Sequence, residues 1–415
     1  MLKRLVFLAV AACLMVTVVA GCSSAPARPA EPPKQQEQKP QETQAPKTTG
    51  LPEMVNIATL GAGSSGYNQT SALAEGIQSV TKSKVRIIPT GNPINRVSQL
   101  VSGSVGYFVG YDEVYLSTEG MAEYATMNLG PMDLRSVLGN RMGLTMVTTA
   151  RSGIKTPYDF KGKRVPYVPG DSSVGYKTSA LLAFGGYTWD DVKPVPYPAW
   201  VESVKGLVAG TCDIAQQACP PSSVIYELAS TPQGVNYPIY AHNDKEGWAR
   251  LHEWAPWIFP MKMDSKDLVG LKPGEAIEMA GYNAPTLVAL ASRDENEVYA
   301  LVKALDESFN TYKDALPEMK GWSIKTAAKP PLPAPLHNGT IKYLKEKGLW
   351  TAEDEAWNNA AIDRVKKVQE AFQTVKVEAQ SKNIKPEEFE AYWMKRKQEL
   401  VGGFCKMLPD FMKKK

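Results

Sequence analysis

The sequence predicts an α/β fold of two lobes followed by a helical extension, and three observations predict it. From Met54 onward, short apolar strands alternate with helical patterns, which is typical of a largely parallel sheet covered by helices. The same order of strand, polar turn and helix begins again after residue 149. Beyond residue 350 the pattern is helical only. At 415 residues the chain is long enough for two ordinary domains.

The N-terminus has the pattern of an export signal. Lys3 and Arg4 precede an apolar run over residues 5–20, which suits a signal-peptide core better than a membrane span. The run ends in Val19-Ala20-Gly21-Cys22, which resembles the lipobox of bacterial lipoproteins. We therefore expect a signal peptide over residues 1–21 and lipidation of Cys22. Two acyl chains would anchor the exported protein stably to the cell membrane.

Residues 22–52 are predicted to be a disordered tether. They are rich in Pro, Gln, Lys, Glu and Ala and contain hardly any large apolar residue, so they cannot bury enough surface to offset the entropy of ordering. The whole chain has 47 basic and 43 acidic residues. This nearly balanced charge gives no reason to expect a nucleic-acid partner.

The first unit of the folded body starts after the tether. Its pattern predicts strands over 55–60, 85–88 and 105–109, and helices over 68–80 and 93–101. The second unit is predicted to contain a short helix over 156–160, strands over 163–168 and 213–216, and helices over 176–184 and 201–208.

Two apolar strands, 144–149 and 287–292, are predicted to cross between the lobes. The second is followed by a helical pattern over 294–312. This interpretation makes the first lobe discontinuous, with residues 53–148 and 287–350, and assigns residues 149–286 to the second lobe. It rests partly on the family resemblance given below.

Residues 351–415 form the predicted C-terminal helical extension. Its apolar residues recur at steps of 4, 4, 3, 4 and 3, as expected for one stripe of a long helix: Trp357, Ala361, Val365, Val368, Phe372 and Val375. A second helix is predicted over 386–401. The pair is interpreted either as a cap packed on the body or as a docking surface for a partner.

The turn from Gly61 to Gly66 matches the dinucleotide-binding pattern GxGxxG between a strand and a helix. Two observations argue against a dinucleotide. The next strand ends at Pro89 without the acidic residue that would bind a ribose, and its neighbours are basic. An exported protein also has little access to nicotinamide cofactors, so we expect no cofactor.

The same turn is suited to binding an anion. Glycines let the backbone approach a ligand, and amides at a helix start can bind a carboxylate. A second glycine- and serine-rich turn, Gly170 to Tyr176, occupies the equivalent place in the second unit. We expect the two turns to face each other across a cleft, although both could be ordinary helix caps. The predicted ligand contacts are Gly63, Ser64, Ser65, Tyr67, Asn92, Asn95, Gly170, Ser172, Ser173 and Tyr176.

Several of these segments resemble the TAXI family, the substrate-binding proteins of TRAP transporters. The similarity covers roughly Met54 to Trp350 and is carried by Leu60–Tyr67, Thr90–Asn95, Leu100–Gly103, Lys161–Val165, Gly170–Ser173 and Gly210–Asp213. The resemblance implies a type II periplasmic-binding-protein-like fold, with hinge strands joining lobes that close on a small organic acid or amino acid. It also implies TRAP membrane subunits as partners.

Two charged residues enter the predicted site from comparison with that family. Asp112 aligns with a family aspartate and could accept a substrate amine, or else begin a helix. Arg141 departs from the family pattern and places a guanidinium near the lobe crossing. It could bind a substrate carboxylate bidentately or form a salt bridge, either on the surface or between the lobes.

Enzyme signatures are poor. The three histidines lack metal-ligand spacing, and neither GxSxG nor a P-loop occurs. Cys212 and Cys219 are interpreted as buried thiols, with a disulfide as the alternative. Aromatic residues crowd positions 237–259 and are interpreted as packing or as cleft walls. The sequence therefore predicts a binding protein without catalysis. A lipoprotein sensor or surface interaction module with the same fold is the alternative.

Overall fold

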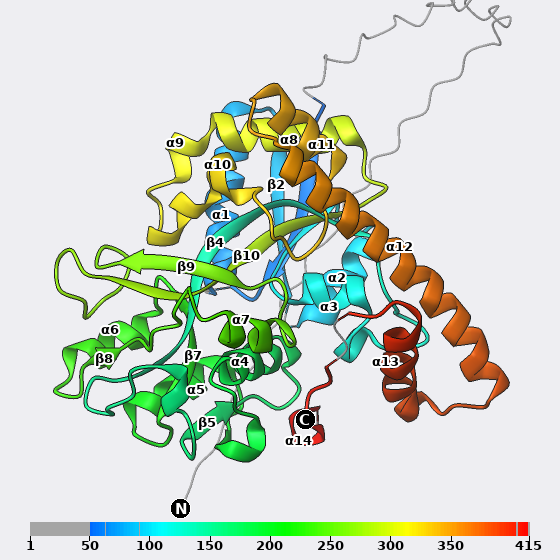
Figure 1. Cartoon of the computed structure of the whole chain (residues 1–415). Coiled ribbons are helices and arrows are strands. Elements are labelled where there is room, and N and C mark those ends of the chain that lie inside the picture. The colour runs from blue at the N-terminus through cyan, green and yellow to red at the C-terminus, as the bar shows by residue number, and fades with distance from the viewer. Residues whose placement is uncertain (1–49, 63, 91, 404–405, 414–415) are drawn as a thin grey trace, which may run out of the picture. The chain divides into compact units, whose positions relative to one another are not determined.

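The computed structural model describes residues 50–62, 64–90, 92–403 and 406–413 (Figure 1). The predicted signal peptide, Cys22 and almost all of the tether lie outside the described residues, as do Gly63 and Cys405. Among the described residues, no helix is both long enough and apolar enough to span a membrane.

Eight strands of the described chain form one mixed sheet. Their order is β2-β1-β3-β10-β4-β7, with β8 paired to β4 and β9 to β10. The other two described strands, β5 and β6, form a separate parallel pair. Neighbours of β1 run parallel to it, but β10 runs antiparallel to both β3 and β4. The α/β class is confirmed, whereas the sheet is parallel only in part. The strands are β1 (Met54–Leu60), β2 (Lys84–Thr90), β3 (Tyr107–Gly110), β4 (Leu134–Thr149), β5 (Arg164–Tyr167), β6 (Lys193–Pro196), β7 (Ile214–Cys219), β8 (Val235–Asn236), β9 (Phe259–Asp264) and β10 (Ala276–Leu290).

Helices cover the sheet and form the C-terminal extension (Figure 1). The α-helices are α1 (Ser65–Val80), α2 (Pro93–Val101), α3 (Glu113–Glu119), α4 (Ser172–Phe184), α5 (Trp200–Val208), α6 (Ser223–Ser230), α7 (Lys245–His252), α8 (Glu295–Glu307), α9 (Phe309–Tyr312), α10 (Ile324–Ala327), α11 (Asn338–Glu346), α12 (Ala352–Ser381), α13 (Phe389–Leu400) and α14 (Asp410–Lys413). The 3-10 helices are η1 (Ala122–Tyr124), η2 (Pro157–Asp159), η3 (Trp189–Asp191), η4 (Pro317–Trp322) and η5 (Pro386–Glu388).

Local sequence explains where several elements begin and end. α2 has its predicted bounds because Asn92 caps it and Pro93 fits the first helical turn. β2 continues through Pro89, contrary to the prediction. Proline is tolerated there because β2 is at the edge of the sheet. α4 begins at Ser172 instead of residue 176, because the Asp171 side chain accepts a hydrogen bond from the Val174 amide.

The two crossing strands are much longer than predicted. β4 and β10 pair from Leu144 opposite Ala280 to Leu134 opposite Leu290. Their register shifts between Asn283 and Thr286, so the ladder is interrupted near its middle. One end of this pair lies beside β3, and the other end lies beside β7 and β9. Their role as crossings between two lobes stays a prediction.

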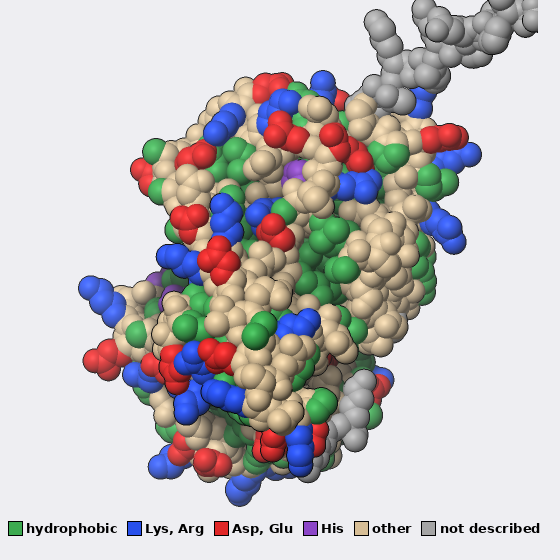
Figure 2. Space-filling view, turned by 90° about the vertical axis from the view of Figure 1, so that its right-hand side faces the viewer, with side chains coloured by type: hydrophobic (Ala, Val, Ile, Leu, Met, Phe, Trp, Pro, Cys, Tyr) green, Lys and Arg blue, Asp and Glu red, His purple; other side chains and the backbone are tan. Residues whose placement is uncertain are grey.

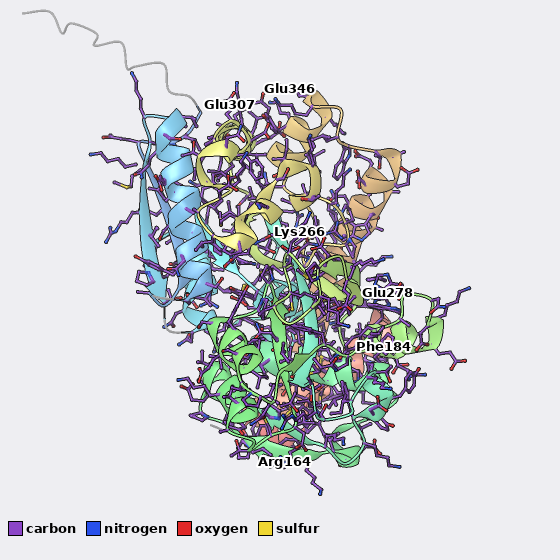
Figure 3. The ribbon with its side chains drawn as sticks, turned by 90° about the vertical axis from the view of Figure 1, so that its left-hand side faces the viewer. Arg164, Phe184, Lys266, Glu278, Glu307 and Glu346 are labelled. Atoms are coloured by element: carbon purple, nitrogen blue, oxygen red, sulfur yellow. The ribbon has the colours of Figure 1, made fainter. Side chains whose placement is uncertain are left out.

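The buried apolar residues form three clusters. One packs around β1, β3 and α8 and includes Ile57, Tyr107 and Leu301; we call these elements, with α1 and α2, the first lobe. Another packs around α5, α6 and β7 and includes Leu207 and Ile225; we call these elements, with α4 and α7, the second lobe. Figure 3 places Glu307 of α8 at one end and Arg164 of β5 at the other. Movement of the lobes as separate bodies stays a prediction.

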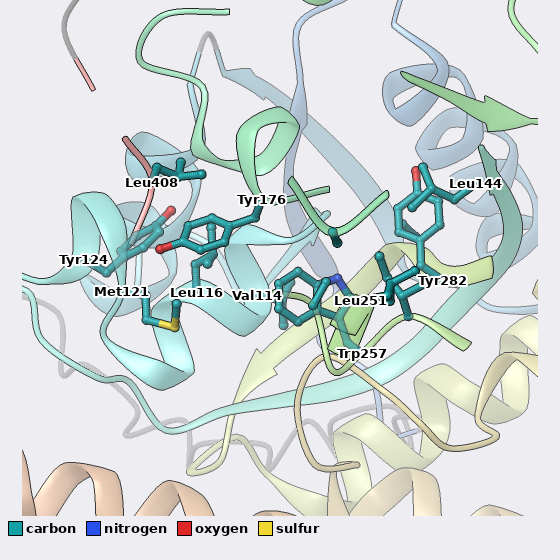
Figure 4. Packing of buried hydrophobic residues seen from close by; sticks show 14 of the residues in the cluster. Val114, Leu116, Met121, Tyr124, Leu144, Tyr176, Leu251, Trp257, Tyr282 and Leu408 are labelled. Atoms are coloured by element: carbon teal, nitrogen blue, oxygen red, sulfur yellow. The ribbon is translucent and has the colours of Figure 1, made fainter. Parts of the chain in front are cut away.

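The third cluster joins both lobes to the C-terminal extension. It includes Phe108 of β3, Leu181 of α4, and Phe372 and Trp393 of the extension. Figure 4 shows part of this cluster around α3 and α4. The predicted stripe of α12 packs inward, since Val365, Val368, Phe372 and Val375 are all buried. The extension therefore packs on the body.

Cys212 and Cys219 are free buried thiols, as favoured from the sequence. Burial raises the pKa of Cys212 to about 11 and that of Cys219 further still. Both side chains therefore act as small apolar groups of the second lobe.

Candidate functional site

Asp112 lies at the centre of the strongest polar cluster between the lobes. It lies two residues after the end of β3, directly precedes α3, and is 1% exposed. Its Oδ2 accepts a 2.6 Å hydrogen bond from the Ser173 hydroxyl and pairs with the Lys177 ammonium. Its Oδ1 accepts a 2.8 Å hydrogen bond from the Trp257 indole. The first lobe thus supplies the carboxylate and the second lobe supplies the donors.

Helix α4 positions two of these donors together. Ser173 and Lys177 are four residues apart and therefore lie on one face of the helix, and the ammonium also donates to the Ser173 Oγ at 2.9 Å. The Lys177 ammonium lies 5.4 Å from the centre of the Tyr282 ring on β10. Asp112 does precede a helix, but its side chain makes no capping hydrogen bond.

Aromatic rings exclude water from the cluster. The ring centroids of Trp257 and Tyr115 are 4.2 Å apart, and Figure 4 shows Trp257 packed between the lobes near Val114 and Leu251. Trp257 is 3% exposed and Lys177 is 4% exposed. Breaking a buried ion pair in such surroundings by removing one partner costs about 3–5 kcal/mol.

The first predicted turn contacts a different part of the first lobe. Ser64 caps α1 by accepting from the Tyr67 amide at 3.1 Å. The Ser65 hydroxyl donates to Glu318 of η4 at 2.7 Å and accepts from Gln69 at 3.0 Å. Gln69 in turn binds Asn140 of β4. Among the bonds of the described residues, none joins this turn to Ser173.

Asn92 and Asn95 also contact each other instead of the second lobe. The Asn92 side chain accepts from the Asn95 amide at 2.8 Å and caps α2. The helix-cap interpretation therefore accounts for their observed bonds. Gly63 lies outside the described residues, and its predicted role is not addressed by the structure.

The second predicted turn is covered by the end of the chain. The Gly170 amide donates to the Met412 carbonyl at 2.7 Å, and the Tyr176 hydroxyl donates to the Lys406 carbonyl at 3.0 Å. Ser172 is 8% exposed at the start of α4. Of the residues predicted from the two turns and their surroundings, the structure brings Ser173 to Asp112.

Arg141 is placed near the middle of β4, but apart from the Asp112 cluster in its contacts. Its guanidinium lies 4.1 Å from the centre of the Phe259 ring, and burial lowers its pKa. No ion pair of Arg141 is formed within the described part of the chain. The predicted inter-lobe salt bridge is therefore not formed by this residue, and Asp112–Lys177 takes that role.

A cavity of about 360 Å³ adjoins the Asp112 cluster and shares Trp257 with it. This volume is within the range of small-molecule sites. Figure 2, which faces this side, shows hydrophobic side chains gathered at mid-height. The cavity is lined by α3, the segment after α7, the segment before α11, and the extension. The lining residues are Tyr115, Thr118, Glu119, Pro256, Trp257, residues 331–335, Trp357, Ala361, Arg364, Val365 and Gly403.

A family model described as the NMT1-like family matches residues 57–348. The chain belongs to the NMT1-like family. No curated protein matches it significantly. Membership places this NMT1-like chain among solute-binding proteins rather than enzymes and agrees with an extracytoplasmic location. The fold is α/β and periplasmic-binding-protein-like, as predicted. The narrower resemblance to TAXI proteins stays a prediction.

Solved structures show partial similarity. The periplasmic aliphatic sulphonate binding protein from Escherichia coli is 16% identical, with 75% of this chain and 86% of that chain covered and a TM-score of 0.39. An ancestral arginine-binding protein bound to arginine is 14% identical over 66% of this chain and 99% of that chain, with a TM-score of 0.37. Substrate-binding domain 2 of GlnP from Lactococcus lactis is 12% identical over 66% and 96%, with a TM-score of 0.36. The ligands named for those proteins are theirs.

Proposed function

We propose that this chain is an extracytoplasmic solute-binding subunit that captures a small organic acid or amino acid between its lobes and delivers it to a TRAP-type membrane transporter. The observation that carries the proposal is the Asp112 cluster, which draws a buried carboxylate from one lobe and an ammonium from the other. The TRAP partner and the lipid anchor at Cys22 rest on the sequence resemblances alone.

The charges of the cluster favour an amino acid over a simple organic acid. When the lobes separate, Asp112 and Lys177 lose each other as partners. A solute with an ammonium and a carboxylate could pair with both when the lobes close again. A solute with a carboxylate alone would leave Asp112 buried without a cation, which is costly. In the structure, the Lys177 ammonium lies beside Asp112, in the position that a substrate amine would take.

The interruption between β4 and β10 supplies a hinge for this movement. Pairing is broken between Asn283 and Thr286. The buried Oδ1 atoms of Asn140 and Asn283 have no hydrogen-bond partner among the described residues. Backbone rotation at this place needs few ladder bonds to break. We therefore place the hinge there, in agreement with the general mechanism of hinge closure around a ligand.

Calorimetric titration of the purified chain tests the proposal. The probes are the amino acids, each paired with the 2-oxo acid that lacks its amine and with the amine that lacks its carboxylate. We expect at least one amino acid to bind at least tenfold more tightly than both matched probes. Ser173→Ala should weaken that binding about tenfold, because a hydrogen bond to a charged group contributes about 1.5–3 kcal/mol.

The matched control is Ser65→Ala, which removes a hydroxyl bonded to Glu318 within the first lobe. It should leave the affinity nearly unchanged if the solute binds at the Asp112 cluster. Equal binding of an amino acid and its 2-oxo acid would contradict the amino-acid assignment. A greater loss from Ser65→Ala than from Ser173→Ala would move the site to the first turn.

A further inference from the structure

The end of the chain is attached to the second lobe. Leu408 and Met412 are 6% and 2% exposed. Both side chains pack against Gly175 of α4, since each has an atom within 3.3 Å of the position that a Cβ atom would take on that residue. Figure 4 shows Leu408 beside Tyr176 of α4. This packing acts together with the bond from the Gly170 amide to the Met412 carbonyl and the bond from the Tyr176 hydroxyl to the Lys406 carbonyl. Residues 406–413 are thereby fixed against the start of α4.

Aromatic and charged contacts extend this attachment. The Phe411 ring centroid lies 4.9 Å from that of Tyr167 and 5.9 Å from that of Trp189. The Lys406 ammonium pairs with Glu253 at 3.2 Å. These partners belong to separate segments of the second lobe, so the contact is an area and not a single bond.

The preceding helices of the extension are attached to α3, which follows the first-lobe strand β3. Glu119 at the end of α3 pairs with Arg364 of α12 at 2.9 Å and with Lys397 of α13 at 2.5 Å. The Trp393 indole donates to the Gly120 carbonyl at 2.7 Å. Phe372 packs on Gly130. A Cβ atom on residue 130 would lie 2.5 Å from the Phe372 ring, so this contact requires glycine.

The two attachments are held to one another. Lys413, at the end of α14, pairs with Glu390 of α13 at 3.0 Å. The extension thus joins the lobes by a route separate from β4 and β10. Separation of the lobes requires residues 406–413 to leave α4, or α12 and α13 to leave α3.

We propose that the C-terminal extension is a strap that holds the lobes closed and limits opening of the cleft. Its bearing on solute uptake rests on the proposed function, but its effect on the distance between the lobes does not. A solute enters only through the open form, so a strap that lowers the open population slows solute association by the same factor. Release of the strap would make the protein receptive.

Electron–electron resonance between two spin labels measures this distance in the absence of any solute. The labels are attached at Glu307→Cys on the first lobe and Lys161→Cys on the second, both at exposed positions. Cys13, Cys22 and Cys405 are replaced by serine, while Cys212 and Cys219 are buried. The full chain should give one short distance when the strap is intact.

The strap is released by Leu408→Asp combined with Met412→Asp, which places two carboxylates in its apolar contact. We expect a second population at longer distance. The matched control, Leu400→Asp, makes the same change at a residue of α13 that is 47% exposed and should keep the single short distance. Lys406→Glu, which opposes Glu253 with a like charge, serves as a milder variant and should raise the longer-distance population less.

A distance distribution in the double variant equal to that of the control would overturn the strap. If the double variant does not fold, as judged by circular dichroism, Lys406→Glu decides the question by the same criterion. Because no solute is present, these results are independent of the calorimetric titration. If the proposed function is wrong, the calorimetric titration will show no binding, and the distances between the spin labels will be unaffected.

Discussion

Replacing Asp112 by asparagine should lower the free energy of unfolding by about 3–5 kcal/mol, because the buried Lys177 ammonium loses its counter-charge. Asparagine keeps the size of the side chain and one carbonyl oxygen, so the loss reports charge and not packing. Chemical denaturation followed by circular dichroism measures the change. For a chain of several hundred residues, the melting temperature should fall by several degrees.

A double replacement, Asp112→Asn with Lys177→Gln, provides the control. Removing both charges takes away the unpaired ammonium, so the double variant should be more stable than Asp112→Asn alone. Interaction energies of 0.5–3 kcal/mol are usual between residues in one such network. Equal stability of the two variants would show that the ion pair does not hold the lobes together.

Glu119→Gln should cause a loss of similar size, about 3–5 kcal/mol. The Glu119 carboxylate pairs with Lys397, which is 0% exposed, and with Arg364. Glutamine would leave the Lys397 ammonium buried with only the Glu119 carbonyl as a described partner. Denaturation measures this change, and Glu378→Gln is the matched control in the extension. Glu378 pairs with Arg396 nearer the surface, so its replacement should change the melting temperature little.

The contribution of Glu119 should depend on pH in a defined direction. Burial alone would raise the pKa of this carboxyl, but Lys397 and Arg364 hold the pKa below its usual range. The stabilisation is therefore present above the ordinary glutamate pKa and is lost as the pH falls through the lowered value. Unfolding should be compared between the unmodified chain and Glu119→Gln at each pH, since burial raises the pKa values of nearby Glu123 and Asp171. A difference that grows toward acid pH would contradict the assigned ion pairs.

Local pattern was sufficient for much of the fold. The apolar run from Val55 to Leu60 forms β1 and the Asn92-Pro93 start forms α2, because strand period and helix capping act within a few residues. The lengths of β4 and β10 were underestimated. Their outer halves contain Arg135 and Glu278, which interrupt an apolar run, and the strands are completed by pairing with segments distant in sequence. Such pairing has no local signal.

The sequence selected Asp112 and Ser173, which the structure brings into one cluster, but it missed the cation at the centre of that cluster. The binding of a ligand by these residues stays a prediction. Lys177 was overlooked because α4 was expected to begin at residue 176, so its position one turn after Ser173 was not recognised. If Asp171 had been recognised as the N-cap of this helix, Ser173 and Lys177 would have been placed on the same helix face. Trp257 had been noted only as one of several aromatic residues. Its bond to Asp112 depends on tertiary packing, as does the bond from Ser65 to Glu318.

The extension was recognised as helical from its apolar stripe, which is a local property of α12. Its connection to the second lobe was not predicted, because the sequence of residues 406–413 has no hydrophobic periodicity that indicates where the segment packs. Leu408, Phe411 and Met412 are spaced by three and one. The burial of Leu408 and Met412 and the ring contacts of the exposed Phe411 depend on surfaces of the second lobe that are distant in sequence.

Mass spectrometry of small molecules released from the denatured, purified chain tests the central claim most directly. The same measurement on the Asp112→Asn/Lys177→Gln double variant, purified in parallel, supplies the reference. We predict that a small metabolite with both an ammonium and a carboxylate is enriched in the unmodified chain and lost from the variant. A metabolite retained equally by both proteins, or one that lacks either charge, would contradict solute binding at the Asp112 cluster.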